Sequence, residues 1–156
     1  MENKKESRKS YSALDIAGKV LKRAAAIPDT DSGELISNMK LQKLLYYLQG
    51  FHLAYFGKPL FEEEIEAWMY GPAVPSVYEH FKGYRNKGIE YTDDVISLSE
   101  EEEALFDEVY RIYGVYSAIG LMEMTHKETP WRTTPTGTGN AISKKVLASF
   151  FKKRLK

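Results

Sequence analysis

The sequence predicts a mainly α-helical, compact single domain of about six helices, with a short β-hairpin or a single strand near residues 64–70. Apolar residues recur at three- and four-residue spacing in several separate segments, which is typical of amphipathic helices. Capping residues, glycines and prolines stand at the ends of these segments, where helices begin and end. A length of 156 residues suits one domain with a buried core. There is no sign of an internal repeat.

The first helix is predicted to begin after Ser12, which can cap it, and to end before Pro28. Residues 29–33 then read as an exposed turn. Residues 1–11 are polar and lack periodicity, so we predict a mobile tail followed by a single domain over 12–156. The apolar positions of this helix are Ala13, Leu14, Ile16, Ala17, Val20, Leu21 and Ala24.

The second helix is expected to begin at a cap formed by Ser37 or Asn38 and to stop at Gly57 and Pro59. Inside it, Gly50 is unfavourable by about 1 kcal/mol relative to alanine. A glycine there indicates a close helix crossing or the approach of another backbone. The predicted apolar face comprises Leu41, Leu44, Leu45, Leu48, Phe51, Ala54 and Tyr55.

The segment after this helix alternates polar and apolar residues from 64 to 70, which predicts a brief strand. The tripeptide Tyr70-Gly71-Pro72 is expected to end any regular element there. A third helix should begin near Pro75, whose fixed φ suits a first turn, and run to near Tyr84. Residues 85–94 then form a loop or a short extended segment.

The second half of the chain holds three further predicted helices. Ser99 and Glu102 form a capping-box pattern at the start of a fourth helix, which ends at Gly114. A fifth helix starts at Ser117 and is bounded by Pro130.

After a flexible Thr- and Gly-rich loop over 133–140, Ser143 is expected to cap the last helix. Ile142 and Leu147 have the spacing of a hydrophobic staple around this cap. Basic residues gather at the C-terminal end of that helix, where the helix dipole favours them.

Charge is balanced overall, with 22 basic and 22 acidic residues, so no partner class is favoured by net charge. The distribution is uneven: residues 90–110 carry nine acidic and no basic residues, and residues 111–156 carry nine basic and two acidic ones. Solvated helix faces and a basic end explain this pattern better than partner steering does. Residues 100–103 also lie where a helix N-terminus stabilises negative charge.

No catalytic constellation is visible. The chain lacks cysteine, and His52, His80 and His126 have no metal-ligand spacing. There is no P-loop and no Gly-x-Ser-x-Gly motif. We therefore predict no enzyme, no metal site and no cofactor. The lack of cysteine, of a long apolar run and of a signal peptide favours a cytoplasmic protein without a membrane anchor.

Aromatic residues are abundant, at 13% of the chain. Tyrosine and tryptophan combine a large contact area with a polar tip, which explains their enrichment at interface hot spots. A domain of this size also needs aromatic side chains in its core. The composition alone therefore divides them evenly between a core and a binding face.

Several blocks of sequence resemble the Panacea domain family, which includes SocA-like antitoxins and GepA-like phage-associated proteins. The blocks are Lys40–His52, Gly57–Phe61, Ile65–Tyr78 and His126–Trp131, and the resemblance extends over residues 12–151. It implies a mostly helical antitoxin of a type II toxin–antitoxin system. Such a protein binds and neutralises a toxin encoded beside it, directly or as an adaptor that delivers the toxin to an AAA+ protease.

The signature residues divide into two predicted roles. Those expected to maintain the scaffold are Leu41, Gln42, Leu44, Gly50, Gly71, Pro72 and Pro75. Those expected to contact the partner, with core packing as the competing interpretation, are Tyr47, Trp68, Tyr70, Tyr78 and Trp131. An alternative function is a nucleic-acid-binding autoregulator that uses the basic segment from Lys144 to Lys156. The oligomeric state is left open.

Overall fold

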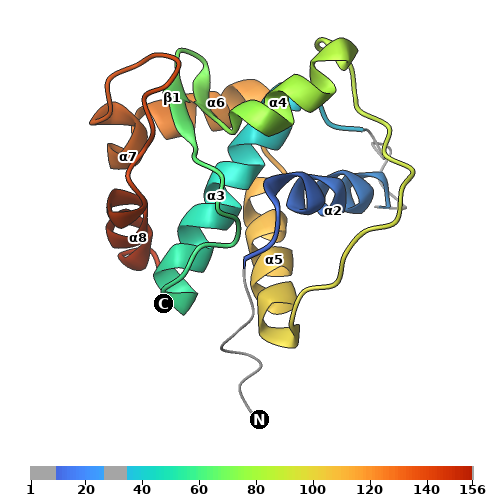
Figure 1. Cartoon of the computed structure of the whole chain (residues 1–156), viewed down its shortest axis with the longest axis horizontal. Helices are drawn as coiled ribbons and strands as arrows, with labels where there is room; N and C mark the ends of the chain where they lie inside the picture. The colour runs from blue at the N-terminus through green and yellow to red at the C-terminus, as the bar shows by residue number, and fades with distance from the viewer. Residues whose placement is uncertain (1–9, 27–34, 156) are drawn as a thin grey trace.

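A computed structural model describes residues 10–26 and 35–155 of the chain (Figure 1). The described part contains seven α-helices and one two-stranded hairpin, which confirms the predicted mainly α fold. The predicted tail over residues 1–9 and the turn at 29–33 lie outside the described residues. The elements are α2 (Ala13–Ala25), α3 (Asn38–Phe56), β1 (Glu66–Trp68), β2 (Gly71–Ala73), α4 (Pro75–Phe81), the 3-10 helix η1 (Lys82–Tyr84), α5 (Glu100–Tyr113), α6 (Ala118–His126), α7 (Thr129–Arg132) and α8 (Lys144–Lys152).

Helix α3 runs through the middle of the molecule (Figure 1). Helices α2 and α5 pack on one side of it, α8 packs on another, and the hairpin lies across its N-terminal half. Every residue from Leu41 to Ala54 is buried, because α3 is enclosed by neighbours on all sides. The sequence predicted a single apolar face that included Tyr55. This was wrong for Tyr55, which is 61% exposed beyond the enclosed part of the helix.

The buried polar side chains of α3 hold the segments around it by hydrogen bonds. The Gln42 side-chain oxygen accepts from Val74 N at 2.8 Å, at the start of α4. The Gln49 side chain accepts from Leu60 N at 2.7 Å and donates to Phe61 O at 2.8 Å. Because buried amides must be paired, these bonds fix where the chain passes over α3.

The helix starts follow the predicted capping residues. Ser99 and Glu102 form a complete capping box at the start of α5. Gly57 ends α3 in the left-handed region at φ 75°, which glycine adopts without strain. Each of the serines at the N-caps of five helices accepts a hydrogen bond from a first-turn N–H; they are Ser12, Ser37, Ser99, Ser117 and Ser143.

The hairpin differs from the prediction in one respect. Gly71 and Pro72 do not end the regular structure but begin β2, which pairs antiparallel with β1 so that Trp68 lies opposite Gly71. Pro72 cannot donate to a strand ladder, but an edge strand tolerates this loss. The prediction of a hairpin near residues 64–70 is otherwise confirmed.

The Thr- and Gly-rich loop lies against the free edge of β1 and was wrongly predicted to be flexible. Gly137 N donates to Ala67 O at 2.8 Å, and Ala67 N donates to Asn140 O at 3.0 Å. Ile142 N continues the contact with Ile65 O at 2.7 Å. The loop thereby covers the edge that the hairpin would otherwise expose.

Two other boundaries differ from the sequence prediction. Pro130 does not bound the fifth helix but lies in the first turn of the short helix α7, a position that suits proline. Tyr11, which was predicted to belong to the tail, is part of the fold: its N–H donates to Leu60 O at 2.8 Å, and its hydroxyl donates to Glu102 at 2.8 Å.

Candidate partner-binding site

Tyr47 is a core residue, so it does not contribute to a surface that meets a partner. Its side chain is fully buried, its ring stacks on Tyr113 at 4.0 Å, and its hydroxyl donates to Glu128 at 2.9 Å. Position 47 lies on a helix that is enclosed on all sides, which the sequence pattern did not reveal. Of the five predicted contact residues, Tyr47 is the one that the structure removes.

Three of the remaining candidates come together beside the hairpin. The Trp68 ring meets Tyr78 of α4 edge to face, with ring centroids 5.2 Å apart. The Trp131 indole N–H from α7 donates to the carbonyl oxygen of Trp68 at 2.8 Å. All three side chains are half-buried, so each packs on the fold and still presents an exposed edge. Residues that are far apart in the sequence therefore form one aromatic surface.

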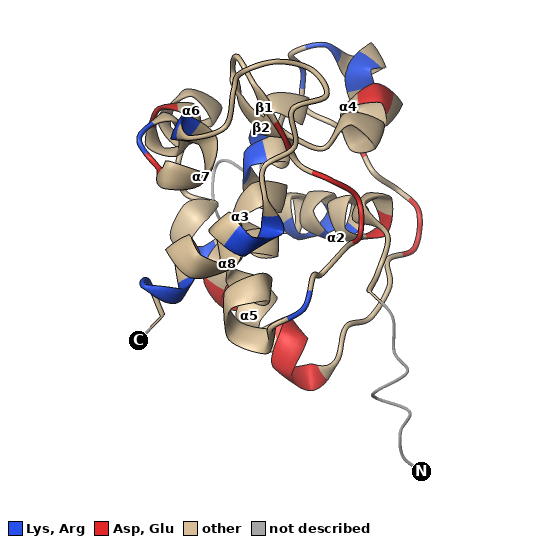
Figure 2. Ribbon diagram, turned by 60° about the vertical axis from the view of Figure 1, so that its left-hand side comes forward, with Lys and Arg blue, Asp and Glu red and all other residues tan. Residues whose placement is uncertain are grey.

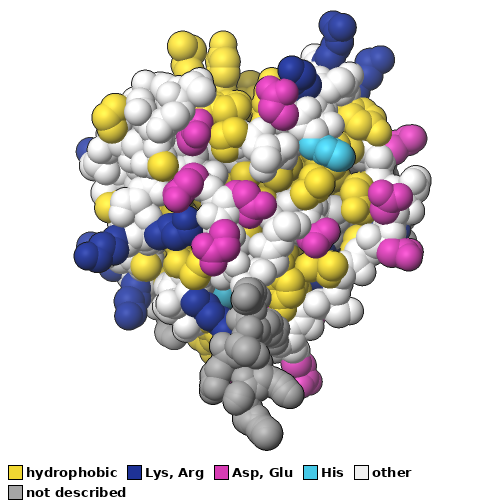
Figure 3. Space-filling model, in the orientation of Figure 1, with side chains coloured by type: hydrophobic (Ala, Val, Ile, Leu, Met, Phe, Trp, Pro, Cys, Tyr) yellow, Lys and Arg dark blue, Asp and Glu magenta, His cyan; other side chains and the backbone are white. Residues whose placement is uncertain are grey.

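The tip of the hairpin adds two strongly exposed side chains to this surface. Met69 is 64% exposed and Tyr70 is 65% exposed. Figure 3 shows hydrophobic side chains projecting from the molecule at the hairpin end, with acidic side chains across the middle of the same face. We call Trp68, Met69, Tyr70, Tyr78 and Trp131 the hairpin surface. Sequence reasoning missed Met69, because alternation along a strand does not show which residues occupy the turn.

The hairpin rests on a buried lysine. The Lys43 side chain from α3 passes under Gly71, where a Cβ atom would lie 2.5 Å from Lys43 Cε. Burial lowers the pKa of Lys43 to about 7, because removing an ammonium group from water disfavours its charged form. No hydrogen bond or ion pair joins this ammonium group to another described residue. Gly71 is therefore required both by its φ of +111° and by the lysine beneath it.

The other signature residues lie in the core or at the ends of elements. Leu41 and Leu44 lie in the core, Gln42 holds the start of α4, and Pro75 occupies the first turn of that helix. Gly50 faces the ring of Phe151. Leu41, Gln42 and Leu44 are buried and therefore do not lie on the surface of the described fold.

Two buried carboxylates each accept several hydrogen bonds in the core. Glu128 accepts from the Tyr46 and Tyr47 hydroxyls at 2.9 Å each and pairs with Arg154 at 3.1 Å. Burial raises the pKa of Glu128, and the neighbouring arginine and hydroxyls oppose the shift. This cluster could not be recognised in the sequence, because Glu128 lies more than 80 residues from Tyr46 and Tyr47.

The second carboxylate, Glu102, lies 2.7 Å from His52 Nε2, and His52 Nδ1 lies 2.7 Å from Lys58 O. His52 is thus a packed, hydrogen-bonded histidine. This pair joins α5 to the end of α3.

The basic C-terminal segment is partly used within the fold. Lys144 pairs with Glu64 at 3.3 Å and Arg154 pairs with Glu128, so both basic groups already have partners within the fold. Lys145 and Lys153 are exposed on either side of the half-buried Phe150. Figure 2 shows the basic residues of α8 and of the C-terminal end separated from the acidic start of α5.

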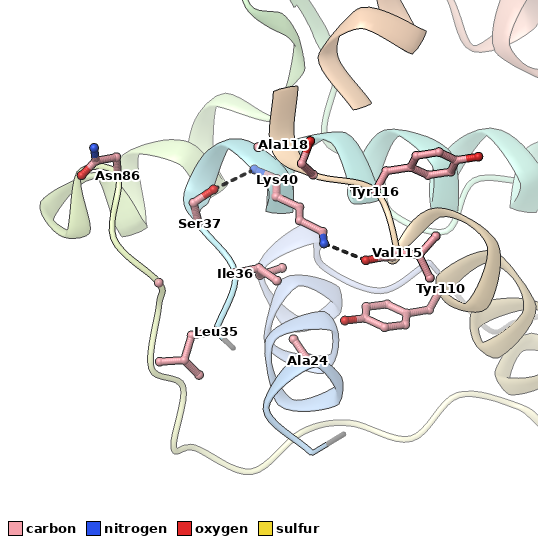
Figure 4. A pocket seen from close by; sticks show the side chains of 13 residues that line it. Ala24, Leu35, Ile36, Ser37, Lys40, Asn86, Tyr110, Val115, Tyr116 and Ala118 are labelled. Atoms are coloured by element: carbon pink, nitrogen blue, oxygen red, sulfur yellow. Dashed lines mark hydrogen bonds between the residues drawn. The ribbon is translucent and has the colours of Figure 1, made fainter. Parts of the chain in front are cut away.

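A pocket of about 650 Å³ opens at the opposite end of α3 from Gly57 (Figure 4). Its walls come from the end of α2, the start of α3, residues 86–88 and the turn between α5 and α6. Lys40 reaches across it and donates to Gly114 O at 2.7 Å. The sequence did not indicate this pocket, because its walls belong to segments that only the tertiary structure brings together.

Among the residues that the structure describes, no group of three or more His, Asp or Glu side chains could hold a metal ion. No described helix is long and apolar enough to cross a membrane.

These features define a small helical domain with an aromatic surface built around a short hairpin. The model of the family described as "Antitoxin SocA-like, Panacea domain" matches residues 41–132. The chain is 31% identical over 146 residues to Antitoxin SocA of Caulobacter vibrioides (strain NA1000 / CB15N), a match that covers 85% of this chain and 75% of that protein. The chain belongs to the SocA-like Panacea domain family. No solved structure matches it.

Proposed function

We propose that this protein is the antitoxin of a toxin–antitoxin pair and that it neutralises a protein toxin by binding it through the hairpin surface. Membership of the SocA-like family supports the antitoxin role. The observation that favours this surface is the exposure of two large side chains, Met69 and Tyr70, at the tip of a hairpin whose strands are held by backbone hydrogen bonds.

The hairpin surface suits protein recognition for energetic reasons. Burying an exposed methionine side chain contributes about 1.5–3 kcal/mol, and aromatic side chains often dominate interface energies. The hairpin is held by β1–β2 pairing, by the 137–142 segment and by the Trp131 hydrogen bond. Little conformational entropy is therefore lost when a partner docks on it.

The function is non-enzymatic and the site of action is the cytoplasm, where a toxin encoded beside the antitoxin would be synthesised. Neutralisation by binding needs no catalytic group, which fits the use of His52 and Glu102 as structural partners. Direct neutralisation keeps the toxin intact, whereas an adaptor for an AAA+ protease shortens its lifetime. Measuring the half-life of the toxin with and without this protein separates the two.

The test is co-expression with each neighbouring gene. A toxin gene should stop growth alone and be tolerated with this protein, and the two proteins should copurify. A Tyr70→Ala, Met69→Ala double variant should fold as the unchanged protein does but fail to rescue growth. Rescue by the double variant would exclude the hairpin surface, and growth that is indifferent to every neighbouring gene would contradict the antitoxin role.

A nucleic-acid-binding role through α8 is a weaker candidate, supported by the exposed Lys145 and Lys153 beside Phe150. Binding through phosphates would weaken steeply as salt rises. Retardation of the promoter DNA of its own operon at low salt, lost in a Lys145→Gln, Lys153→Gln variant, would support it. No retardation at low salt would exclude it.

A further inference from the structure

Lys43 is a charged residue that the fold buries without giving it a partner. It is 2% exposed, and no hydrogen bond or ion pair joins its ammonium group to another residue that the structure describes. Its three N–H donors are therefore unused within the described fold. Since an unpaired buried charge lowers stability, the packing of the core does not explain this lysine. The other buried polar residues of the described fold all have hydrogen-bond partners; they are Asn38, Gln42, Gln49, His52, Glu102, Thr125 and Glu128.

The support that Lys43 gives to the hairpin does not require an ammonium group. Its aliphatic stem lies under Gly71, where a Cβ atom would stand 2.5 Å from Lys43 Cε and 3.2 Å from Lys43 Nζ. An unbranched methionine side chain would fill the same space. Burial lowers the pKa of Lys43 to about 7, which reflects the cost of placing the charge there. A residue that is kept at a cost in stability is typical of a functional contact.

The Lys43 nitrogen is accessible from outside the molecule. Among the described residues, one side-chain polar atom is fully enclosed without a hydrogen-bond partner, and that atom is His126 Nε2. The unpartnered Lys43 nitrogen is not enclosed in this way, so it touches solvent through a small opening. Because the nitrogen lies beside Gly71, this opening is next to Met69 and Tyr70 at the tip of the hairpin. A group on a docking partner can therefore reach it.

His126 provides a second unpaired polar group at the same end of the hairpin. Its ring stacks on Trp131, with ring centroids 4.0 Å apart, and the Trp131 indole N–H donates to Trp68 O at 2.8 Å. Trp68 lies opposite Gly71 in the β1–β2 pairing. Unpaired polar groups are rare inside native folds. Finding Lys43 and His126 at one end of the hairpin indicates a contact that the free protein lacks.

A partner on the hairpin surface would change the surroundings of Lys43. When it covers the hairpin tip it also closes the opening, so the ammonium group loses its remaining water. This loss weakens binding unless the partner provides an acceptor. Among protein side chains, a carboxylate is the strongest acceptor for an ammonium group, because both groups are charged. The carboxylate of the hairpin itself, Glu66, already accepts from Trp68 Nε1 and from Gly139 N at 2.9 Å each.

We propose that the Lys43 ammonium group binds the carboxylate of an Asp or Glu side chain of the partner that docks on the hairpin surface. The proposal rests on the proposed function, because this partner is the toxin. It adds the chemistry of the contact, which is one acidic side chain within a surface that otherwise packs on Met69 and Tyr70. Since only 2% of Lys43 is exposed, a single extended side chain fits the opening.

The first test measures the binding of the neighbouring toxin to Lys43→Met by isothermal titration calorimetry. The substitution removes the ammonium group and leaves an unbranched side chain under Gly71, so the hairpin should keep its place. Toxin binding should weaken about thirtyfold or more, because the toxin carboxylate is then buried without a partner. The thermal midpoint verifies that the variant is folded. The matched control Lys58→Met removes the charge of an exposed lysine just beyond α3 and should bind the toxin normally.

Substitutions in the toxin identify the carboxylate. Each surface Asp or Glu of the toxin is changed to Asn or Gln, and each variant is measured against the unchanged protein and against Lys43→Met. One acidic residue should show a strong loss with the unchanged protein and little further loss with Lys43→Met, because both substitutions remove the same contact. Losses that are additive with Lys43→Met at every acidic residue would overturn the proposal.

The second test needs no toxin. The full-length protein with ¹³C-labelled lysine is titrated with phenylacetate at pH 6, where Lys43 is charged because its pKa is about 7. Sodium chloride keeps the ionic strength constant, and Lys43→Met assigns the Lys43 Cε resonance. Phenylacetate should shift this resonance in a saturable way, whereas the uncharged phenylacetamide should not. Equal shifts with the amide, or no saturable shift with the acid, would overturn the proposal.

The two tests separate this proposal from the proposed function. If Lys43→Met binds the toxin as tightly as the unchanged protein, the carboxylate contact is excluded and the antitoxin role stands. If no neighbouring gene is toxic, the proposed function fails, and the phenylacetate titration still decides whether Lys43 binds a carboxylate.

Discussion

The ring of Phe151 in α8 packs directly on the Cα of Gly50 in α3, where a Cβ atom on residue 50 would overlap the ring. The two helices share the largest helix–helix contact of the described fold. Gly50→Ala should therefore lower the free energy of unfolding by about 1–3 kcal/mol, although alanine favours helix by about 1 kcal/mol. Urea unfolding followed by circular dichroism measures the change.

The matched control is Gly83→Ala in η1, where a Cβ atom would meet open space. It should alter the free energy of unfolding by less than about 0.5 kcal/mol. In a Phe151→Ala background, Gly50→Ala should cost clearly less than it does alone. An equal cost in both backgrounds would show that the ring is not the reason for the glycine.

Helix positions and most helix ends could be predicted from the sequence, because caps and periodicity are local. The close crossing at Gly50 was also predictable, since a glycine inside a strong helix needs a reason. What the sequence could not reveal is which side of α3 faces water. With neighbours on all sides, Tyr46 and Tyr47 became core residues, and only Tyr55 remained exposed.

The candidate site was less predictable for the same reason. Trp68, Tyr78 and Trp131 were chosen for their chemistry, but their grouping depends on hydrogen bonds between distant segments. Met69 was missed because the exact position of the turn depends on Gly71 and on Lys43 beneath it. The Figure 4 pocket depends on four separate segments, none of which carries a recognisable motif.

Because Lys43 is buried, we expect the free energy of unfolding to increase with pH above neutrality. Its pKa is about 7 in the folded protein and near 10.5 when exposed. Between these values the unfolded chain binds more protons than the folded one, so the free energy of unfolding should rise from pH 7 toward pH 10.5. Lys43→Met should remove this rise and be more stable than the unchanged protein at pH 7.

Urea unfolding at pH 7 and pH 9.5 tests this prediction, with Lys58→Met as the control at an exposed lysine. Lys58→Met should show the same increase in the free energy of unfolding as the unchanged protein. If Lys43→Met shows the same pH dependence as the unchanged protein, the ammonium group is not the group responsible.

Because Glu102 is held as a hydrogen-bonded carboxylate, we expect the protein to lose stability in acid. Burial raises its pKa, but hydrogen bonds from His52, Tyr11 and Ser99 outweigh this and lower the pKa from 4.5 to about 2. Its contribution should be fully present above pH 4.5 and be lost as the pH falls toward 2. Glu102→Gln replaces the carboxylate that is hydrogen-bonded to His52 and Tyr11 and should cost about 1.5–3 kcal/mol at pH 7.

Thermal unfolding of both proteins between pH 7 and pH 2 provides the measurement. The difference in thermal midpoint between Glu102→Gln and the unchanged protein should narrow steadily below pH 4.5. Glu101→Gln, at an exposed neighbouring position, should match the unchanged protein throughout. A gap that stays constant down to pH 2 would contradict the assigned role of Glu102.

Tyr70 provides the direct prediction for toxin binding. It is 65% exposed at the hairpin tip and supports no other described residue by a hydrogen bond, so its loss should leave the thermal midpoint unchanged. At the centre of an interface, an aromatic hot spot contributes about 2 kcal/mol or more, which is about thirtyfold in Kd. Tyr70→Ala should therefore weaken toxin binding about thirtyfold, as measured by isothermal titration calorimetry. Tyr55→Ala, a tyrosine of similar exposure on α3, should bind toxin normally, and an equal loss in both variants would place the contact away from the hairpin.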